Sequence, residues 1–392
     1  AACRLCSGPL SPLLDLGESP LANDFVSAPE PQPSYPLALS QCSACAHVQM
    51  SGTVPPEDMF RADYAYAAGT SPVFRDHLQR LARSLASKLF PGDLVVDIGS
   101  NDGTLLSNFD PPLRAFGVDP ARELALMTTR RGIMTYPDFL TAETARAIVR
   151  AAGRASVVLA TNSLAHIENT HDVAEAIRAL LAETGFLVAE VAYLPDLVRT
   201  NNFAGVYQEH VHQWALAPLI KFWSDHGMTL YDAERIDTQG GSIRYYVGKG
   251  RKAATDRLHD LLRAEDSLPA ALAEWPERVA ASRQSIGDAV RGLKEAGHSI
   301  CGYGASAKST TLLHSCGLGR GEIDAVFDLN PRKVGKFTPG THIPIVSPEA
   351  LERRKPDYCL MLSGNFSASI RSQHPGYAGK WVELLPEVRV VE

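Results

Sequence analysis

Long apolar runs are missing from this 392-residue sequence, and with them the main signals of a membrane protein. No stretch reaches the roughly 20 apolar residues that a membrane-spanning helix needs, and the N-terminus lacks the apolar core of a signal peptide. An excess of basic residues is missing too, since 38 Lys and Arg stand against 44 Asp and Glu, a net charge of −6. That balance argues against broad binding to nucleic acid or to anionic membranes. We therefore expect a soluble, cytoplasmic protein with neither kind of partner.

The length and composition indicate several domains. A chain of this length holds two or three domains of about 150 residues each, and its 45% hydrophobic content is enough for several cores. We place a small module at 1–68, a second domain at 69–250 and a third at 251–392. The first segment is rich in Pro, Ser and Cys with only short β-like stretches, so alone it can bury little apolar area.

Four of the seven cysteines form two closely spaced pairs in the first segment. Cys3 and Cys6 make one Cys-x-x-Cys pair, and Cys42 and Cys45 make the other. Each pair bends two thiolates toward one metal ion, so together they predict a closed, structural four-cysteine zinc site. Two disulfides are the alternative, which a reducing compartment disfavours.

A strand, a glycine-containing turn and an apolar helix start follow one another at residues 95–106. Such a turn opens a ligand pocket at the carboxyl end of a parallel strand, because glycine lets the backbone approach a ligand closely. The spacing is not the Gly-x-Gly-x-x-Gly of dinucleotide-binding folds. It resembles motif I of S-adenosylmethionine (SAM) dependent methyltransferases. The resemblance implies SAM contacts from Asp97, Gly99, Asn101 and Asp102.

A second acid supports a cofactor site. Asp119 lies 22 residues after Asp97, at the end of the next expected strand, and Pro120 follows it. An acid about 20 residues on accepts hydrogen bonds from ribose hydroxyls. Taken alone, Asp119 has a buried turn aspartate as its alternative. Asp138 and Phe139 come later, and we expect them near the adenine.

Expected strands and amphipathic helices alternate through the second segment. A helix begins near Ser71, another covers 172–182, and the expected strands are 115–119, 156–161 and 186–191. This alternation predicts a doubly wound parallel sheet. Residues 228–236 and 242–247 are typical of the antiparallel hairpin that ends a methyltransferase sheet.

A helical stretch at 255–296 then connects to a third domain, with a strand and glycine turn at 299–308 and strands at 323–328 and 358–363. The fold class is therefore α/β. It combines a zinc-binding module, a SAM-binding Rossmann domain and a second, Rossmann-like C-terminal domain.

The second glycine turn supports a rival hypothesis. Gly302, Gly304 and Ala307 fit the dinucleotide fingerprint, and Asp328 ends a later strand. Taken alone, this predicts a nicotinamide-dependent oxidoreductase. Lys308 stands where the glycine turn and the helix N-terminus favour phosphate, with a solvated helix lysine as the alternative. The substrate contacts that we expect from this domain are Tyr303, Ser306, Lys308 and Arg332.

Residues that suit acid–base chemistry gather in one short stretch: Tyr207, Glu209, His210 and His212. Tyr207 and His210 are three residues apart, so one helical turn would project them to the same side. Histidine is a natural general base at neutral pH, and a phenol can donate to a developing oxyanion. Asn162 and His166 follow another strand, at the rim where substrate would lie. The competing use of Glu209, His210 and His212 is a zinc or iron site, which would need a further, distant ligand.

In this order the motifs resemble the sugar C-methyltransferases of antibiotic deoxysugar biosynthesis, across essentially the whole chain. The resemblance rests on both cysteine pairs and on residues 96–106, 162–167, 207–210, 241–244, 302–308 and 338–345. It implies a nucleotide-linked 4-keto-deoxysugar substrate, usually carried by thymidine diphosphate and methylated next to the ketone. It also implies that His210 and Tyr207 are the acid/base pair, with Glu209, His166 and Asn162 around the sugar. We take His210 as base and Tyr207 as oxyanion donor, although the two roles could be exchanged.

The sequence departs from that family pattern where the sugar should lie. Gln208 replaces a usual histidine, His212 and Gln213 stand where a tyrosine or similar residue is frequent, and Ala204 replaces an acid. The particular sugar and the methylated carbon therefore stay open, as does the oligomeric state. A third hypothesis is a non-catalytic zinc protein that binds nucleotides through both Rossmann units.

Overall fold

The computed structural model describes residues 2–59 and 68–391, and its largest sheet has seven strands. These are β4 (Leu94–Ile98), β5 (Arg114–Val118), β6 (Met134–Tyr136), β7 (Ala155–Thr161), β8 (Leu181–Ala192), β10 (Met228–Ile236) and β11 (Ser242–Lys249). Their order is β10-β11-β8-β7-β4-β5-β6, and the strands from β4 to β8 run parallel while β11 and β10 are added antiparallel. The predicted parallel sheet and its terminal hairpin are confirmed.

Helices cover both faces of this sheet, because successive side chains of a strand point to opposite faces. Val95 and Val157 lie in one core with the apolar side of α2 (Pro72–Ala86), which Ser71 caps by accepting from the Phe74 amide. Val96 and Val158 lie in the opposite core. The helices around that second face are α4 (Ala142–Ala152), α5 (Thr170–Leu180) and α7 (Leu216–Asp225).

One expected element is shorter than predicted. The segment after the first glycine turn forms only a short 3-10 helix, η2 (Leu106–Asn108), instead of the α-helix start that we expected. Pro111 and Pro112 follow it closely, and proline cannot continue a helix. The next α-helix is α3 (Arg122–Arg130), after β5.

The N-terminal segment forms a four-stranded antiparallel sheet whose last strand comes from the middle of the chain. β1 (Leu10–Ser19), β2 (Tyr35–Cys42) and β3 (Val48–Met50) pair in order, and β9 (His212–Gln213) pairs with β3. The strands are longer than the short stretches expected. Leu16 and Leu39 lie in a hydrophobic core that also contains residues of the C-terminal domain. The segment therefore buries apolar area by sharing a core, which the sequence alone did not indicate.

The C-terminal domain has six strands in the order β14-β13-β12-β15-β16-β17, of which β17 is antiparallel. The strands are β12 (Ile300–Tyr303), β13 (Val326–Phe327), β14 (Ile345–Val346), β15 (Tyr358–Met361), β16 (Lys380–Glu383) and β17 (Arg389–Val391). The helices are α10 (Ala307–Ser315), α11 (Ala350–Arg354) and α12 (Ser367–Gln373). The strand predicted at 323–328 is confined to β13, because Asp328 turns back to the glycine loop, where its carboxylate accepts from the Ala305 amide.

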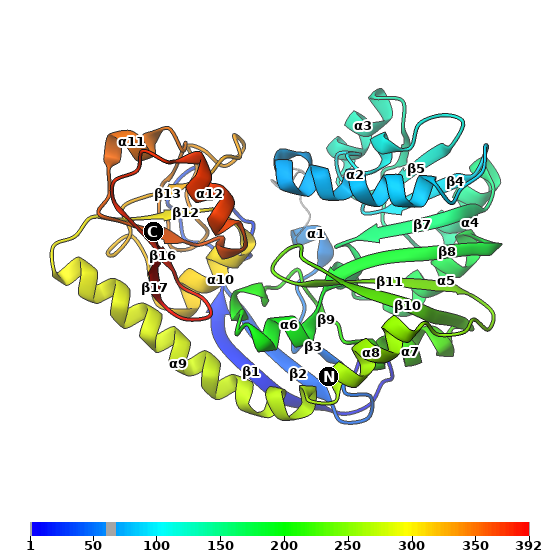
Figure 1. Ribbon diagram of the computed structural model, residues 1–392, viewed down its shortest axis with the longest axis horizontal. Helices are drawn as coiled ribbons and strands as arrows, with labels where there is room; N and C mark the ends of the chain where they lie inside the picture. The colour runs from blue at the N-terminus through cyan, green and yellow to red at the C-terminus, as the bar shows by residue number, and fades with distance from the viewer. Residues whose placement is uncertain (1, 60–67, 392) are drawn as a thin grey trace.

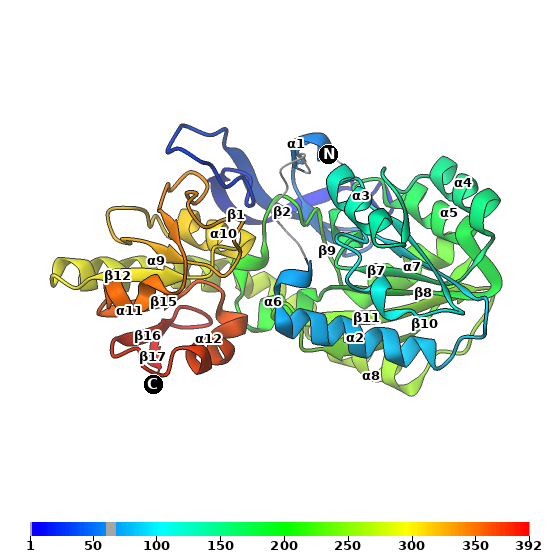
Figure 2. The ribbon, with the colours of Figure 1, turned by 90° about the horizontal axis from the view of Figure 1, so that it is seen from above.

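Two helices join the domains where the sequence predicted one stretch: α8 (Asp256–Glu265) and α9 (Leu268–Glu295). Figures 1 and 2 show the seven-stranded sheet and the C-terminal domain on opposite sides of the molecule. In Figure 1, β1–β3 lie below and between them, and α9 runs along the lower edge. Within the described residues, no helix combines the length and apolarity needed to cross a membrane. The boundary predicted after residue 68 follows 60–67, which lie outside the described residues, and the three domain ranges stay predictions.

Candidate active site

A cavity of about 510 Å³ opens at the carboxyl ends of β4, β5 and β7. Seven of the eight predicted cofactor contacts line it: Asp97, Gly99, Asn101, Asp119, Pro120, Asp138 and Phe139. Two predicted catalytic residues, Asn162 and His166, line it as well. The structure thus brings the proposed cofactor and substrate groups to one place, as expected for residues that follow parallel strands of one sheet.

The turn after β4 has the shape that its glycine permits. Gly99 has a φ of +71°, and a Cβ at this position would lie 2.7 Å from the Cβ of Ser163. Asn101 also has a positive φ, and its side-chain oxygen accepts from the Ala68 amide. The backbone can therefore approach a ligand here without a side chain in the way.

Asp102 is the predicted cofactor contact that does not line this cavity. Its carboxylate accepts from the Gly69 amide at 3.0 Å and from both the amide and the hydroxyl of Thr104. The side chain therefore ties the turn to η1 (Ala68–Thr70). The sequence placed Asp102 in the right turn, but the direction of its side chain depends on turn geometry that the motif does not specify.

Several buried polar atoms at the cavity have no hydrogen-bond partner within the described part of the chain. They are Asp97 Oδ1, Ser100 Oγ, Asn162 Nδ2 and Ser163 Oγ. Burial, with the nearby charges of Asp119 and Glu190, raises the pKa of Asp97 well above its ordinary value. Buried polar atoms are costly unless a partner satisfies them, so this set fits a polar, cationic ligand such as SAM.

Asp119 is positioned by the backbone of two loops. Its carboxylate accepts from the amides of Asn101 and Ala121, at 2.7 and 2.8 Å. Burial raises its pKa, and these two hydrogen bonds oppose that shift. The side chain stands at the tip of β5, where a ribose would be bound in this kind of sheet.

Tyr207 and His210 are in direct contact, although they lie on a tight turn and not on the helical turn that we expected. The His210 amide donates to the Tyr207 carbonyl at 2.9 Å, which closes the turn. The side chains meet at 2.5 Å between Tyr207 Oη and His210 Nε2. His210 Nδ1 donates to the Gly205 carbonyl at 3.2 Å, so the proton of a neutral ring is on Nδ1. Nε2 therefore carries a lone pair, which accepts from the Tyr207 hydroxyl.

Burial keeps the histidines of the site neutral. Burial first, and then the charges of His166 and Lys308, hold the pKa of His210 well below its ordinary value. Burial lowers the pKa of His166 to about 4. The two rings lie edge to face with centroids 5.1 Å apart. Because His166 lines the cavity at the ends of β4, β5 and β7, the Tyr207–His210 pair lies one residue away from this cavity.

The predicted alternative of a catalytic metal site at Glu209, His210 and His212 is wrong. In the described part of the chain, the cysteine cluster is the one group of three or more potential ligands close enough to hold a metal. Glu209 accepts from the side-chain amide of Asn23 at 2.6 Å. His212 turns to His47 instead.

Lys308 extends from the C-terminal domain toward the seven-stranded sheet. Its ammonium group donates to the carbonyl of Gln239, in the turn between β10 and β11, and burial lowers its pKa to about 8. A cavity of about 470 Å³ lies at the same turn. Its lining includes Gln239, Gly240, Arg199, Arg235, Asn365 and Phe74, and Phe74 also lines the cavity at the ends of β4, β5 and β7.

The other substrate contacts predicted in the C-terminal domain lie elsewhere. Tyr303 is buried and its hydroxyl is 2.9 Å from His374 Nε2, among the aromatic rings of this domain. Ser306 caps α10 by accepting from the Ser309 amide. Arg332 is exposed. Tyr303 and Ser306 thus build the domain itself, and none of the four predicted contacts, Lys308 included, lines either cavity.

The four predicted zinc ligands converge. The sulfur atoms of Cys3, Cys6, Cys42 and Cys45 all lie within 4.8 Å of one another, and none is in a disulfide. Cys3 and Cys45 are 3.6 Å apart, and Cys6 and Cys42 are 3.5 Å apart. Zinc–sulfur bonds of about 2.3 Å in a tetrahedron place sulfurs about 3.8 Å apart, so the cluster fits zinc.

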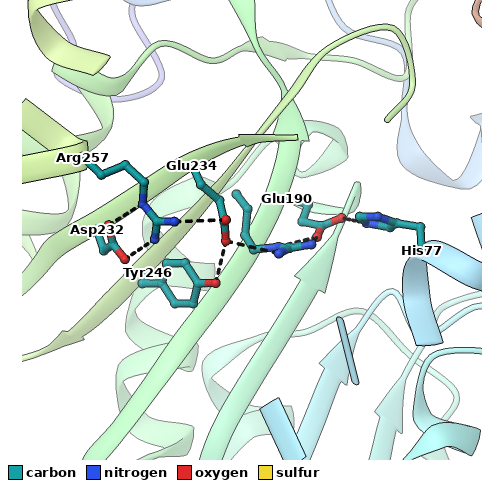
Figure 3. A network of polar contacts seen from close by, with 7 residues as sticks. His77, Glu190, Asp232, Glu234, Tyr246 and Arg257 are labelled. Carbon is teal, nitrogen blue, oxygen red and sulfur yellow. Dashed lines mark hydrogen bonds and ion pairs between the residues drawn. The ribbon is translucent and has the colours of Figure 1, made fainter. Parts of the chain in front are cut away.

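A buried ion-pair network beside the cavity was not predicted (Figure 3). Glu190, fully buried near the end of β8, lies 2.7 Å from His77 on α2 and 2.7 Å from Arg244 on β11. Arg244 continues to Glu234 at 3.2 Å, and Glu234 to Arg257 on α8 at 3.1 Å. The sequence did contain one indication of this network, because Glu190 is an acid inside an otherwise apolar strand. The network fixes α2 and the hairpin against the strand end next to Asp97.

Family models assign the class of the protein. Residues 67–237 match a model described as a methyltransferase domain, 237–386 one described as a C-methyltransferase C-terminal domain, and 3–60 one described as a zinc binding domain. With the cavity and the cysteine cluster, these matches define a SAM-dependent methyltransferase with a zinc-binding module. They replace the hypotheses of a nicotinamide oxidoreductase and of a non-catalytic nucleotide-binding protein.

The similarity to one curated protein is more specific. C-methyltransferase NovU of Streptomyces niveus is 32% identical over 411 residues, which cover 99% of this chain and 96% of the relative. The chain therefore belongs to the C-methyltransferase family.

Solved structures that resemble part of the chain are distant. They include magnesium protoporphyrin IX methyltransferase from Synechocystis with bound S-adenosylhomocysteine, at 16% identity and a TM-score of 0.35, covering 45% of this chain and 83% of that one. A SAM-dependent methyltransferase from Anabaena variabilis has 18% identity and a TM-score of 0.37, covering 46% and 86%. The family assignment rests on NovU and the family models.

Proposed function

We propose that this enzyme transfers the methyl group of SAM to the carbon next to the ketone of a nucleotide-linked 4-keto-deoxysugar, with thymidine diphosphate as the carrier. The contact between Tyr207 and His210, beside a histidine that lines the SAM cavity, carries the proposal. A base and an oxyanion donor next to a methyl donor are what α-proton removal and methylation of the enolate require.

His210 is the base in this proposal. Its ring is neutral because its pKa is low, and its Nε2 carries no proton because the proton is on Nδ1. The Tyr207 hydroxyl donates to Nε2 and exchanges this bond for one to the ketone oxygen. Nε2 then takes the α-proton, and the electron pair of the broken C–H bond forms the enolate, whose oxygen Tyr207 stabilises. SAM, when bound, supplies the electrophilic methyl group. Proximity of the two reacting carbons contributes much of the rate.

Asn162, His166 and Glu209 surround the sugar in the proposed complex. The Asn162 side-chain amide is a buried donor without a partner among the described residues, which suits a sugar hydroxyl. The cavity at the β10–β11 turn takes the nucleotide part, since Arg199 and Arg235 line it and the Lys308 ammonium group reaches the carbonyl of Gln239 in its wall. Phe74 lines both cavities, so the two lie next to each other.

The test is mass spectrometry of the protein incubated with SAM and a panel of thymidine diphosphate 4-keto-6-deoxysugars. A product heavier by one CH₂, with loss of deuterium from the carbon next to the ketone, is expected. His210→Ala should lower turnover by about 10² to 10⁴-fold without changing SAM affinity, as loss of a general base does. His171→Ala, in a surface histidine pair, is the matched control. Binding of SAM without a methylated product from any sugar would contradict the proposed acceptor.

A further inference from the structure

The catalytic turn, residues 207–210, continues directly into the sheet of the zinc module. β9 pairs antiparallel with β3, so that His212 lies opposite Gln49 and Gln213 opposite Val48. The Met50 amide also donates to the Val211 carbonyl at 3.0 Å. The backbone one residue after His210 is therefore held by the N-terminal sheet.

His212 joins this sheet to the other catalytic loop. Its Nε2 donates to the carbonyl of Ile167, next to His166, at 3.1 Å. Because a carbonyl only accepts, the proton of a neutral His212 is on Nε2, and its Nδ1 is unprotonated. The Nε2–H of His47 donates to this Nδ1 at 2.9 Å. His212 is buried and lies between His47 and the loop that carries His166.

His47 is in turn placed by the second cysteine pair. Its backbone carbonyl accepts from the Cys42 amide at 2.8 Å, and it follows Cys45 by two residues in the same turn. Its ring is fully buried, with the ring of Trp214 at 5.1 Å, and Trp214 also stacks on His212 at 4.8 Å. A continuous series of contacts thus runs from the metal ligands to both catalytic histidines.

We propose that the zinc module is a positioning element of the active site: when the four cysteines hold their metal, His47 and His212 fix the loops that carry His210 and His166. His47 and His212 are positioning residues, because neither lines the SAM cavity. The inference rests on the proposed roles of His210 and His166. It goes beyond a folding role for the metal, because it links the metal to two particular loops.

The first test measures amide hydrogen exchange of the holoprotein by mass spectrometry, before and after zinc is removed with a chelator. Peptides over 205–214 and 163–169 should exchange at least about tenfold faster without metal, as expected for local opening. Those over β4 and β7, and the SAM affinity, should stay unchanged. Unchanged protection of 205–214 would overturn the proposal. Equal loss of protection in β4 and β7 would also overturn it, because the metal would then act on the whole fold.

The second test uses zinc-loaded variants. His212→Phe keeps an aromatic ring beside Trp214 but removes both hydrogen bonds. It should lower kcat by about tenfold to a hundredfold with KM and SAM affinity unchanged, since small displacements of a catalytic group have effects of this size. His212→Gln, whose amide both accepts and donates, should restore most of that loss. His171→Phe is the matched control, because it breaks a surface histidine pair of the same 2.9 Å length.

A His212→Phe variant with the kcat of the wild type, or one that Gln does not rescue, would refute the positioning role. Failure of the positioning role can be distinguished from failure of the proposed methyl transfer to a sugar. If wild-type protein methylates no sugar of the panel, the acceptor is wrong. The exchange measurement then still decides whether the metal orders residues 205–214, since it needs no turnover.

Discussion

The turn after β4 and the turn after β12 share a buried strand, a glycine with positive φ and an acid on the neighbouring strand. The acid after the neighbouring strand is held alike at both turns: Asp119 accepts from the amides of Asn101 and Ala121 at the first turn. The first turn also has Asp97 on β4 itself, whose Oδ1 has no hydrogen-bond partner among the described residues, and it lines a cavity of about 510 Å³. At the second, Asp328 accepts from the amides of Ala305 and Asn330, and the Lys333 ammonium donates to the Ala305 carbonyl.

Glycine serves the same purpose at the two turns, since a Cβ on Gly99 would lie 2.7 Å from the Cβ of Ser163. A Cβ on Gly304, which has a φ of +96°, would lie 2.2 Å from Ser363 Oγ, so the space over the second turn is filled by the protein itself. The two turns differ in other polar atoms: Asp97 Oδ1 and Ser100 Oγ at the first turn have no partner among the described residues, whereas both carboxylate oxygens of Asp328 at the second turn accept backbone hydrogen bonds. A glycine fingerprint therefore predicts a ligand site only where its polar neighbours are unpaired.

The largest difference is expected when each acid loses its charge. Asp97→Asn should weaken SAM binding by about tenfold to a hundredfold, the range for loss of a hydrogen bond to a charged group. Asp328→Asn should leave SAM affinity unchanged and lower the free energy of unfolding, because it weakens bonds within the C-terminal domain. Calorimetry and thermal denaturation measure the two quantities. Equal loss of SAM affinity in both variants would contradict the comparison.

Lys308 belongs to the second turn but extends to the β10–β11 turn, where we propose that the nucleotide part of the substrate binds. Its removal should raise KM for the nucleotide sugar about tenfold, as loss of a charge-assisted contact does. Its folded pKa of about 8 lies below the ordinary 10.5. Between these values the unfolded chain binds the extra proton, so the free energy of unfolding rises with pH. Chemical denaturation from pH 7 to 10.5 should show this rise in the wild type and a smaller one in Lys308→Met. Identical pH profiles would show that Lys308 is not desolvated.

The substitutions Gly99→Ala and Gly304→Ala should separate an effect on SAM affinity from an effect on the stability of the fold. Both substitutions place a side chain at positive φ, which costs about 1–2 kcal/mol of unfolding free energy. SAM affinity should fall only in Gly99→Ala, whose Cβ meets Ser163 at the cavity. Titration calorimetry compares the two, with Gly92→Ala as a control that has positive φ and nothing within 4 Å. A loss of SAM affinity in Gly304→Ala would show that the second turn communicates with the first.

The smallest effect is expected for Asp102. Its carboxylate bonds to Gly69 and Thr104, so Asp102→Asn should lower stability by about 0.5–1.5 kcal/mol, the usual net contribution of a hydrogen bond. SAM affinity should stay near that of the wild type. A loss as large as that of Asp97→Asn would return Asp102 to the cofactor contacts that the motif predicted.

The sequence predicted the groups whose position follows from strand ends. Asp97 and Asp119 were identifiable because parallel strands bring their carboxyl ends to one edge of the sheet. Tyr207 and His210 were identified as a pair, although a tight turn and not a helix joins them. Tyr303 was misplaced because the fingerprint does not reveal whether its side chains face a ligand or a core.

Contacts between distant segments could not be predicted. Glu190 has partners 113 and 54 residues away in the sequence, and the pairing of β3 with β9 joins residues more than 160 positions apart. A single sequence gives local pattern and the chemistry of short motifs. It does not show which segments contact one another across the molecule, and here such contacts hold residues 207–213 in place.

The pairing of β9 with β3 limits how relatives of this enzyme can exchange parts. The family models divide the chain near residues 60 and 237, which suggests that the zinc module could be exchanged as an independent unit. Its sheet, however, takes its last strand from residues 212–213, inside the methyltransferase segment. A chimera that transplants 3–60 alone would place a foreign β3 and His47 against the resident β9. Recombination that preserves activity should therefore transfer residues 205–214 together with the N-terminal module.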